Sequence, residues 1–195
     1  MLIPRCGVPD IFHQKPSKQN NSTTSFRSNY SFFPRKQKWR PFKTHLTYSI
    51  HPVPKGFGID RVRNACASAF QKWSAVSKFT FLEGSEGKKT DIVIGFYRGR
   101  HGDGHPFDGP GHILSHAFAP EDGRFHYDAD EKWSDNPGRD EFDLESLALH
   151  EIGHLLGLEH SHDPGSVMVP SIGAGVTRRK LGQDDINGIR ALYSG

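Results

Sequence analysis

The run His150-Glu151-Ile152-Gly153-His154-Leu155-Leu156-Gly157-Leu158-Glu159-His160 decides how this chain folds around its centre. His150 and His154 are four residues apart, so on a helix they share one face, about 40° apart. Two imidazoles placed in this way can bind one metal ion, and Glu151 lies beside them, able to reach a metal-bound water. Gly157 tolerates the left-handed conformation that ends a helix, so the chain can turn back and His160 can supply a third nitrogen.

Three histidine ligands leave one position of a tetrahedral zinc ion open, which is typical of a catalytic site. Zinc lowers the pKa of its water and polarises a carbonyl group, while Glu151 accepts the water proton and can pass it to the leaving amine. The alternative is a helix with incidental surface histidines, but Gly157 and His160 at these offsets argue against it. The extended pattern also requires a methionine turn, which Met168 in the segment 166–170 supplies.

Composition sets the remaining bounds on function. A chain of 195 residues fits one domain, and most of its twelve histidines lie between His101 and His162. The net charge of +3 comes from scattered basic residues, so we expect no nucleic-acid partner. No apolar run approaches the roughly 18–20 residues that span a bilayer. Of the two cysteines, Cys66 falls on an apolar helical face and is expected to be a buried, inert thiol.

The N-terminal part differs in composition. Residues 11–31 are rich in Ser, Asn, Gln, Lys and Thr, which predicts a flexible linker. Asn20, Asn21 and Asn29 begin glycosylation sequons, which matter only if the chain is secreted. The first residues lack the apolar region of a signal peptide, which favours a fragment of a longer precursor. We therefore divide the chain into residues 1–31 and a globular domain of residues 32–195.

Hydrophobic periodicity predicts an α+β fold with a twisted, mixed five-stranded sheet and three helices. The expected strands cover residues 45–50, 79–82, 91–96, 114–119 and 124–127. The expected helices cover residues 59–76, 141–156 and 183–193. Asp140 is the expected N-cap of the second helix, and the long Gly/His/Asp loop at residues 99–112 indicates a functional segment.

The segment Pro4-Arg5-Cys6-Gly7-Val8-Pro9-Asp10 resembles the cysteine switch at the end of the propeptide in the matrixins, the matrix metalloproteinases of the metzincin clan. The resemblance covers essentially the whole chain. It implies that the Cys6 thiolate occupies the open zinc position and holds the enzyme latent. It also implies that Arg5 and Asp10 pair to shape the switch loop.

The same resemblance implies further ions. A second, structural zinc would bind four side chains: His101, Asp103, His116 and His126. At least one calcium ion would bind oxygen atoms of six residues: Asp108, Gly109, Gly111, Ile113, Asp128 and Glu131. The family's second calcium site carries an Asp where this chain has Arg124, and a cation there should weaken or abolish that site.

The resemblance also implies a substrate pocket. Ser146 falls where some relatives close the pocket, so its small side chain predicts an open pocket for a large apolar residue such as Leu. Pro170 and Ile172 belong to the expected outer wall, and residues 113–117 are the expected edge strand for extended substrate. The segments 143–146 and 123–128 look most like plant matrixins.

These features predict a secreted, monomeric zinc endopeptidase that cleaves extracellular proteins and is latent while Cys6 binds the zinc. A non-catalytic, metal-dependent peptide-binding module is the competing hypothesis, and the intact Glu151 argues against it. In a third interpretation, Cys6 does not dock well because the rest of the propeptide is missing.

Overall fold

The structure is a computed structural model that describes residues 3–9, 28–85 and 87–194. Asp10, most of the expected linker and the sequons at Asn20 and Asn21 lie outside the described residues. Asn29 is described and exposed.

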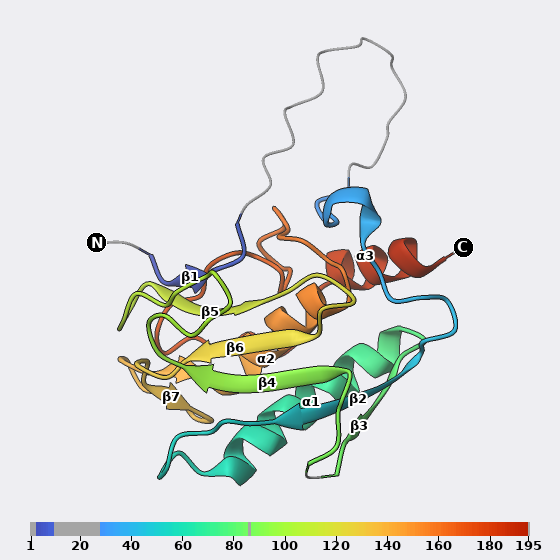
Figure 1. Ribbon diagram of the computed structural model, residues 1–195. Coiled ribbons are helices and arrows are strands. Elements are labelled where there is room, and N and C mark those ends of the chain that lie inside the picture. The colour runs from blue at the N-terminus through green and yellow to red at the C-terminus, as the bar shows by residue number, and fades with distance from the viewer. Residues whose placement is uncertain (1–2, 10–27, 86, 195) are drawn as a thin grey trace.

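A mixed, six-stranded sheet forms one layer of the domain (Figure 1). Its spatial order is β1-β5-β6-β4-β2-β3. The strands are β1 (Arg5–Cys6), β2 (His45–Ile50), β3 (Thr80–Glu83), β4 (Ile92–Tyr97), β5 (Ile113–Ala117) and β6 (Arg124–Asp128). Only the β5–β6 pair is antiparallel. The five strands expected from sequence are thus confirmed, and the N-terminal segment adds β1 at one edge.

Three α-helices accompany the sheet: α1 (Ile59–Val76), α2 (Leu144–Leu155) and α3 (Gln183–Tyr193). Helices α1 and α2 pack against each other behind the sheet in the view of Figure 1, with α3 nearby at the C-terminal end. A 3₁₀ turn, η1 (Pro34–Lys36), and a small pair of strands, β7 (Trp133–Ser134) and β8 (Phe142–Asp143), complete the described elements.

Helix α2 begins at Leu144, so the prediction of a start at Glu141 with Asp140 as the cap was wrong. Phe142 and Asp143 pair instead with β7, and the Asp143 side chain accepts a hydrogen bond from Ser146 N at 2.8 Å. An aspartate in that position satisfies one of the N–H groups that the first turn leaves free. The expected end is confirmed, because Gly157 has φ of 101° two residues after the helix.

The core lies between the sheet and helices α1 and α2. Trp73 of α1 is fully buried, and its indole N–H donates to Leu149 O in α2 at 2.8 Å. Cys66 is also fully buried, and burial raises the pKa of its thiol to about 12, which fits the expected inert thiol.

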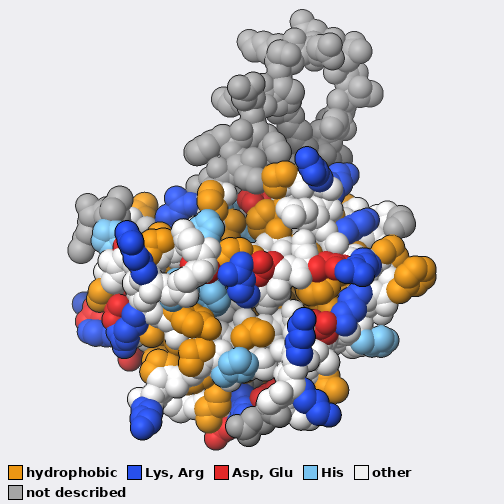
Figure 2. Space-filling model, in the orientation of Figure 1, with side chains coloured by type: hydrophobic (Ala, Val, Ile, Leu, Met, Phe, Trp, Pro, Cys, Tyr) orange, Lys and Arg blue, Asp and Glu red, His pale blue; other side chains and the backbone are white. Residues whose placement is uncertain are grey.

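On the face shown in Figure 2, Lys and Arg side chains are interspersed with Asp and Glu rather than gathered into one field of positive charge. Within the described part of the chain, the helices are too short or too polar to cross a membrane.

Candidate active site and metal centres

Helix α2 and the turn after it bring His150, His154 and His160 together. The Nε2 atoms of His150 and His154 lie 3.1 Å apart, and ligand atoms of the three histidines and Cys6 all lie within 4.8 Å of one another. The four residues are buried. Their order in the sequence explains the geometry, because two ligands come from one helical face and Gly157 reverses the chain before the third.

Backbone carbonyl groups orient two of these rings. His150 Nδ1 lies 2.7 Å from Val167 O, and His154 Nδ1 lies 2.7 Å from Leu158 O. When Nδ1–H donates to a carbonyl group, Nε2 carries the lone pair that can bind a metal, which is the common arrangement around bound metals. Burial lowers the pKa of His150 to about 3, so its imidazole is neutral at pH 7.

Glu151 lies on the same helix and is fully buried. Its Oε1 accepts a hydrogen bond from the Ser115 hydroxyl at 2.6 Å, whereas its Oε2 is buried with no hydrogen-bond partner among the described residues. Burial raises the pKa of Glu151 to about 7. The result is a carboxylate with one oriented oxygen and one oxygen available to a proton.

The N-terminal segment covers this centre. Cys6 Sγ lies 3.6 Å from His154 Nε2, and Val8 N donates to Sγ at 3.3 Å. Strand β1 pairs in parallel with the outer edge of β5, and Cys6 N donates to Pro170 O at 2.9 Å. The segment therefore lies between the expected substrate edge strand and the expected pocket wall.

The donor set fits a zinc ion. A tetrahedral ion with N and S ligands places neighbouring nitrogens about 3.3 Å apart and a sulfur about 3.6 Å from a nitrogen. The measured separations of 3.1 and 3.6 Å are close to those values. Burial and the nearby charge of Glu151 raise the pKa of the Cys6 thiol well above its usual range, so a cation is needed to keep it as a thiolate.

Met168 is buried next to Gly153 of helix α2. Its sulfur packs so close to Gly153 that a Cβ atom at this position would overlap it. Asp185 of α3 fixes this turn, because it accepts hydrogen bonds from the Ser166 hydroxyl and from Val167 N, the latter at 3.0 Å. Val167 is the residue whose carbonyl orients His150.

A second cluster joins the loop after β4 to strands β5 and β6. Asp103 Oδ2 lies 2.7 Å from His101 Nε2, 2.7 Å from His116 Nε2 and 2.9 Å from His126 Nδ1. The ring nitrogens of His101 and His116 lie 3.1 and 3.2 Å from His126 Nδ1. Burial lowers the pKa of both His116 and His126 to about 4, so these two rings are neutral at pH 7. All four expected ligands are thus brought together in a set that suits a closed, structural zinc site.

The acids expected to bind calcium are close, though less tightly gathered than the two clusters above. Asp108 Oδ1 accepts from Ile113 N at 3.1 Å, and Glu131 accepts from Gly111 N. Asp128 Oδ2 is buried with no hydrogen-bond partner among the described residues. Burial and then the charge of Asp108 raise the pKa of Asp128 to about 6. Gly109 and Gly111 both have positive φ angles, so the loop between these acids follows a path that glycine favours.

Arg124, the residue expected to weaken a second calcium site, pairs with a carboxylate two residues away. Its Nε donates to Asp122 Oδ1 at 2.6 Å, and its guanidinium lies 3.9 Å from the centre of the Phe118 ring. The Asp122 carboxylate is therefore already paired with a cation from the protein.

A pocket opens beside His150. Its lining includes Ser146, Leu147, Val167, Pro170, Ile172 and Arg178. Cys6 also lines it, so the N-terminal segment reaches its mouth. The Ser146 hydroxyl donates to Asp143 and accepts from Arg178 N at 2.7 Å.

Sequence reasoning missed several residues that support the site. Ser115 orients Glu151, Asp185 fixes the methionine turn, and the pair Asp143–Arg179 holds the start of α2. Alternation along β5 could have placed Ser115 on the inner face, but its partner follows only from the three-dimensional packing of β5 on α2.

The fold and the two histidine clusters define an α+β domain that is suited to hold two metal ions. A family model described as Matrixin matches residues 38–194, so this chain belongs to the matrixin family. Metalloendoproteinase 1 of Glycine max is 47% identical over 99% of this chain and 64% of that protein. Metalloendoproteinase 5-MMP of Arabidopsis thaliana is 40% identical over 100% of this chain and 56% of that protein.

An animal protein is also similar. Interstitial collagenase of Sus scrofa is 43% identical over 99% of this chain and 37% of that protein. The chain thus spans less than two thirds of the length of these relatives.

Proposed function

We propose that this chain is a zinc-dependent endopeptidase domain, held latent by Cys6, that cleaves extended segments of extracellular proteins. The observation that carries the proposal is the convergence of His150, His154 and His160 around a buried Glu151 with one unsatisfied oxygen. The family supports the class of reaction. The division into residues 1–31 and 32–195, secretion and a monomeric state remain part of the proposal.

The three histidines would hold the zinc through Nε2 of His150, Nε2 of His154 and a ring nitrogen of His160. When bound, the ion supplies a Lewis acid and lowers the pKa of a water molecule. Glu151 Oε2 would take the proton of that water while Ser115 holds Oε1 in place. The same carboxyl group can then give the proton to the amine that leaves.

The substrate would pair with β5 once the N-terminal segment leaves, because β1 now uses that edge. The side chain after the scissile bond would enter the pocket beside His150. The lining residues Leu147, Val167 and Ile172 make this pocket suited to an apolar side chain.

Replacing Glu151 tests the reaction. Glu151→Gln should retain zinc, measured by elemental analysis, yet cleave a fluorogenic peptide slower by a factor of about 10³ or more after activation with a thiol-reactive mercurial. Normal cleavage by this variant would disprove the role of Glu151. If the wild type binds zinc and peptide without turnover, the chain is a binding module instead.

Replacing Cys6 tests latency. Cys6→Ser should be active without the mercurial, because serine is a poorer zinc ligand than a thiolate. Cys66→Ser is the matched control, since it removes the other buried thiol, which lies on α1 and belongs to neither histidine cluster. Equal activity of Cys6→Ser and untreated wild type would show that the N-terminal segment does not inhibit the enzyme through Cys6.

A further inference from the structure

Two adjacent arginines connect the outer wall of the pocket to the first turn of α2. We call residues 170–178 the wall segment. At its end, Arg178 N donates to the Ser146 hydroxyl at 2.7 Å. The Arg178 guanidinium donates to Pro164 O and Ser166 O at 2.7 and 2.8 Å, at the beginning of the methionine turn.

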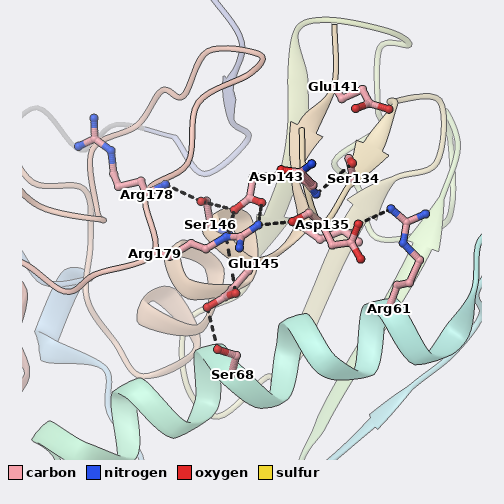
Figure 3. A network of polar contacts seen from close by, with 12 residues as sticks. Arg61, Ser68, Ser134, Asp135, Glu141, Asp143, Glu145, Ser146, Arg178 and Arg179 are labelled. Carbon is pink, nitrogen blue, oxygen red and sulfur yellow. Dashed lines mark hydrogen bonds and ion pairs between the residues drawn. The ribbon is translucent and has the colours of Figure 1, made fainter. Parts of the chain in front are cut away.

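Arg179 makes the second connection (Figure 3). Its Nε donates to Asp143 Oδ1 at 2.9 Å and its Nη2 donates to Oδ2, so the contact uses both oxygens of the carboxylate. Nη2 also donates to Asp135 O at 2.6 Å. The Asp143 side chain is fully buried, whereas that of Arg179 is 35% exposed.

Asp143 therefore has two tasks at one place. It caps α2 by accepting from Ser146 N at 2.8 Å, and it pairs with Arg179. A buried carboxylate is costly without a cation, so the pair holds Arg179 firmly against the helix start. A bidentate guanidinium–carboxylate contact also fixes direction, which a lysine ammonium group cannot reproduce.

In the middle of the wall segment, Ile172 and Ala174 pack against the hydrophobic core, and Ser171 forms a bridge with Arg5. Gly175 N donates to Glu141 O at 2.9 Å, and the contact of Pro170 O is with Cys6 of the N-terminal segment. Gly173, Gly175, Val176 and Thr177 are exposed. When the N-terminal segment leaves, the contacts of Arg178 and Arg179 are the polar ones that still hold the end of the wall segment against the start of α2.

We propose that Arg179 is a positioning residue that sets substrate selectivity: its pair with Asp143 fixes the wall segment against α2 and so fixes the width of the pocket beside His150. This proposal rests on the peptidase function proposed above. Arg179 does not touch the substrate, so its loss should change which side chain the pocket prefers more than it changes the reaction itself.

The test compares two peptides that differ only after the scissile bond, one with Leu and one with Trp. Both peptides are measured after mercurial activation of the full chain. In Arg179→Lys, the ratio of kcat/KM for the preferred peptide to kcat/KM for the other peptide should fall about tenfold. The double variant R179M/D143N leaves no unpaired buried charge and should show the same change. Arg61→Lys is the matched control, because its ion pair with Asp135 lies in the same network but is exposed.

Amide hydrogen exchange supplies a readout that needs no activity. Exchange at residues 171–178 should become faster in Arg179→Lys and stay unchanged in Arg61→Lys. An unchanged kcat/KM ratio, or an equal loss for both peptides, would overturn the proposal. If the wild type cleaves neither peptide, the peptidase function fails, and unchanged exchange would separately refute the anchoring role.

Discussion

Gly153 lies at a position of the zinc-binding run where a side chain would overlap Met168. A Cβ atom there would overlap Met168 Sδ and lie 3.1 Å from Trp73 Cζ2. Gly153→Ala should lower the free energy of unfolding by about 1–3 kcal/mol through overpacking, even though alanine favours the helix by about 1 kcal/mol. Urea denaturation at saturating zinc measures this.

Met168→Ala is the partner for a double-mutant cycle with Gly153→Ala. The double variant should be more stable than the sum of the two single losses implies, because the overlap is gone. Strictly additive losses would show that Gly153 does not need to be small for the sake of Met168.

We expect calcium binding at the proposed site to depend on pH through Asp128. Its pKa of about 6 lies above the ordinary value of 3.8. Without a bound cation, the free energy of unfolding therefore falls as the pH rises from 3.8 to about 6. Calcium removes that cost only where the carboxylate is ionised. The gain in Tm on adding calcium should therefore be large at pH 7.5 and small at pH 5, by differential scanning fluorimetry.

Asp128→Asn should lose most of this calcium response at pH 7.5. Asp122→Asn is the control, since Asp122 is paired with Arg124 and should leave the response intact. A calcium response that is equal at both pH values would contradict the role of Asp128.

At the scale of elements, the C-terminal end of α2 depends on side chains from distant segments. Tyr193 OH of α3 donates to Leu156 O at 2.8 Å and accepts from Trp39 N at 3.1 Å. Tyr193→Phe removes one oxygen and keeps the ring, so it should cost about 1–3 kcal/mol in urea denaturation. Tyr30→Phe, which removes a hydroxyl from a half-buried ring, should cost clearly less. Equal costs would show that the helix end does not need this contact.

The elements also show what sequence periodicity can and cannot predict. The helices at Ile59–Val76 and Gln183–Tyr193 were predicted with their observed bounds, since a regular apolar face and acidic first turns mark them. The start of α2 was misplaced because residues 141–143 carry helix-compatible side chains, while pairing with β7 decides their conformation. Such pairing is tertiary and leaves no local pattern.

The site divides in the same way. The convergence of His150, His154 and His160 could be predicted from sequence because the three residues are close in the chain, with spacings of four and six residues. The ligands of the second cluster followed from family spacing, since His101 and His126 lie on separate elements. Asp143 and Arg179 have no local relation, so neither periodicity nor the motif indicated their pair.

At the scale of the whole molecule, the cluster of His101, Asp103, His116 and His126 connects a long loop to the sheet. Asp103→Asn should reduce the zinc content from two ions per chain to one, by elemental analysis, because the carboxylate is the only anion of the set. His105→Ala should keep both ions. A content of two in Asp103→Asn would show that the three histidines suffice.

The segment at residues 29–32 lies beside the turn that carries the third histidine. The Ser31 hydroxyl contacts His160 O at 2.5 Å, Phe32 forms a bridge with Leu158, and His162 N donates to Asn29 O at 3.2 Å. These contacts join positions about 130 residues apart, and contacts of such separation form slowly because long loops must close first. During refolding, high zinc affinity should therefore arise late, after the helices have formed. Tight zinc binding would then accompany the last step of folding.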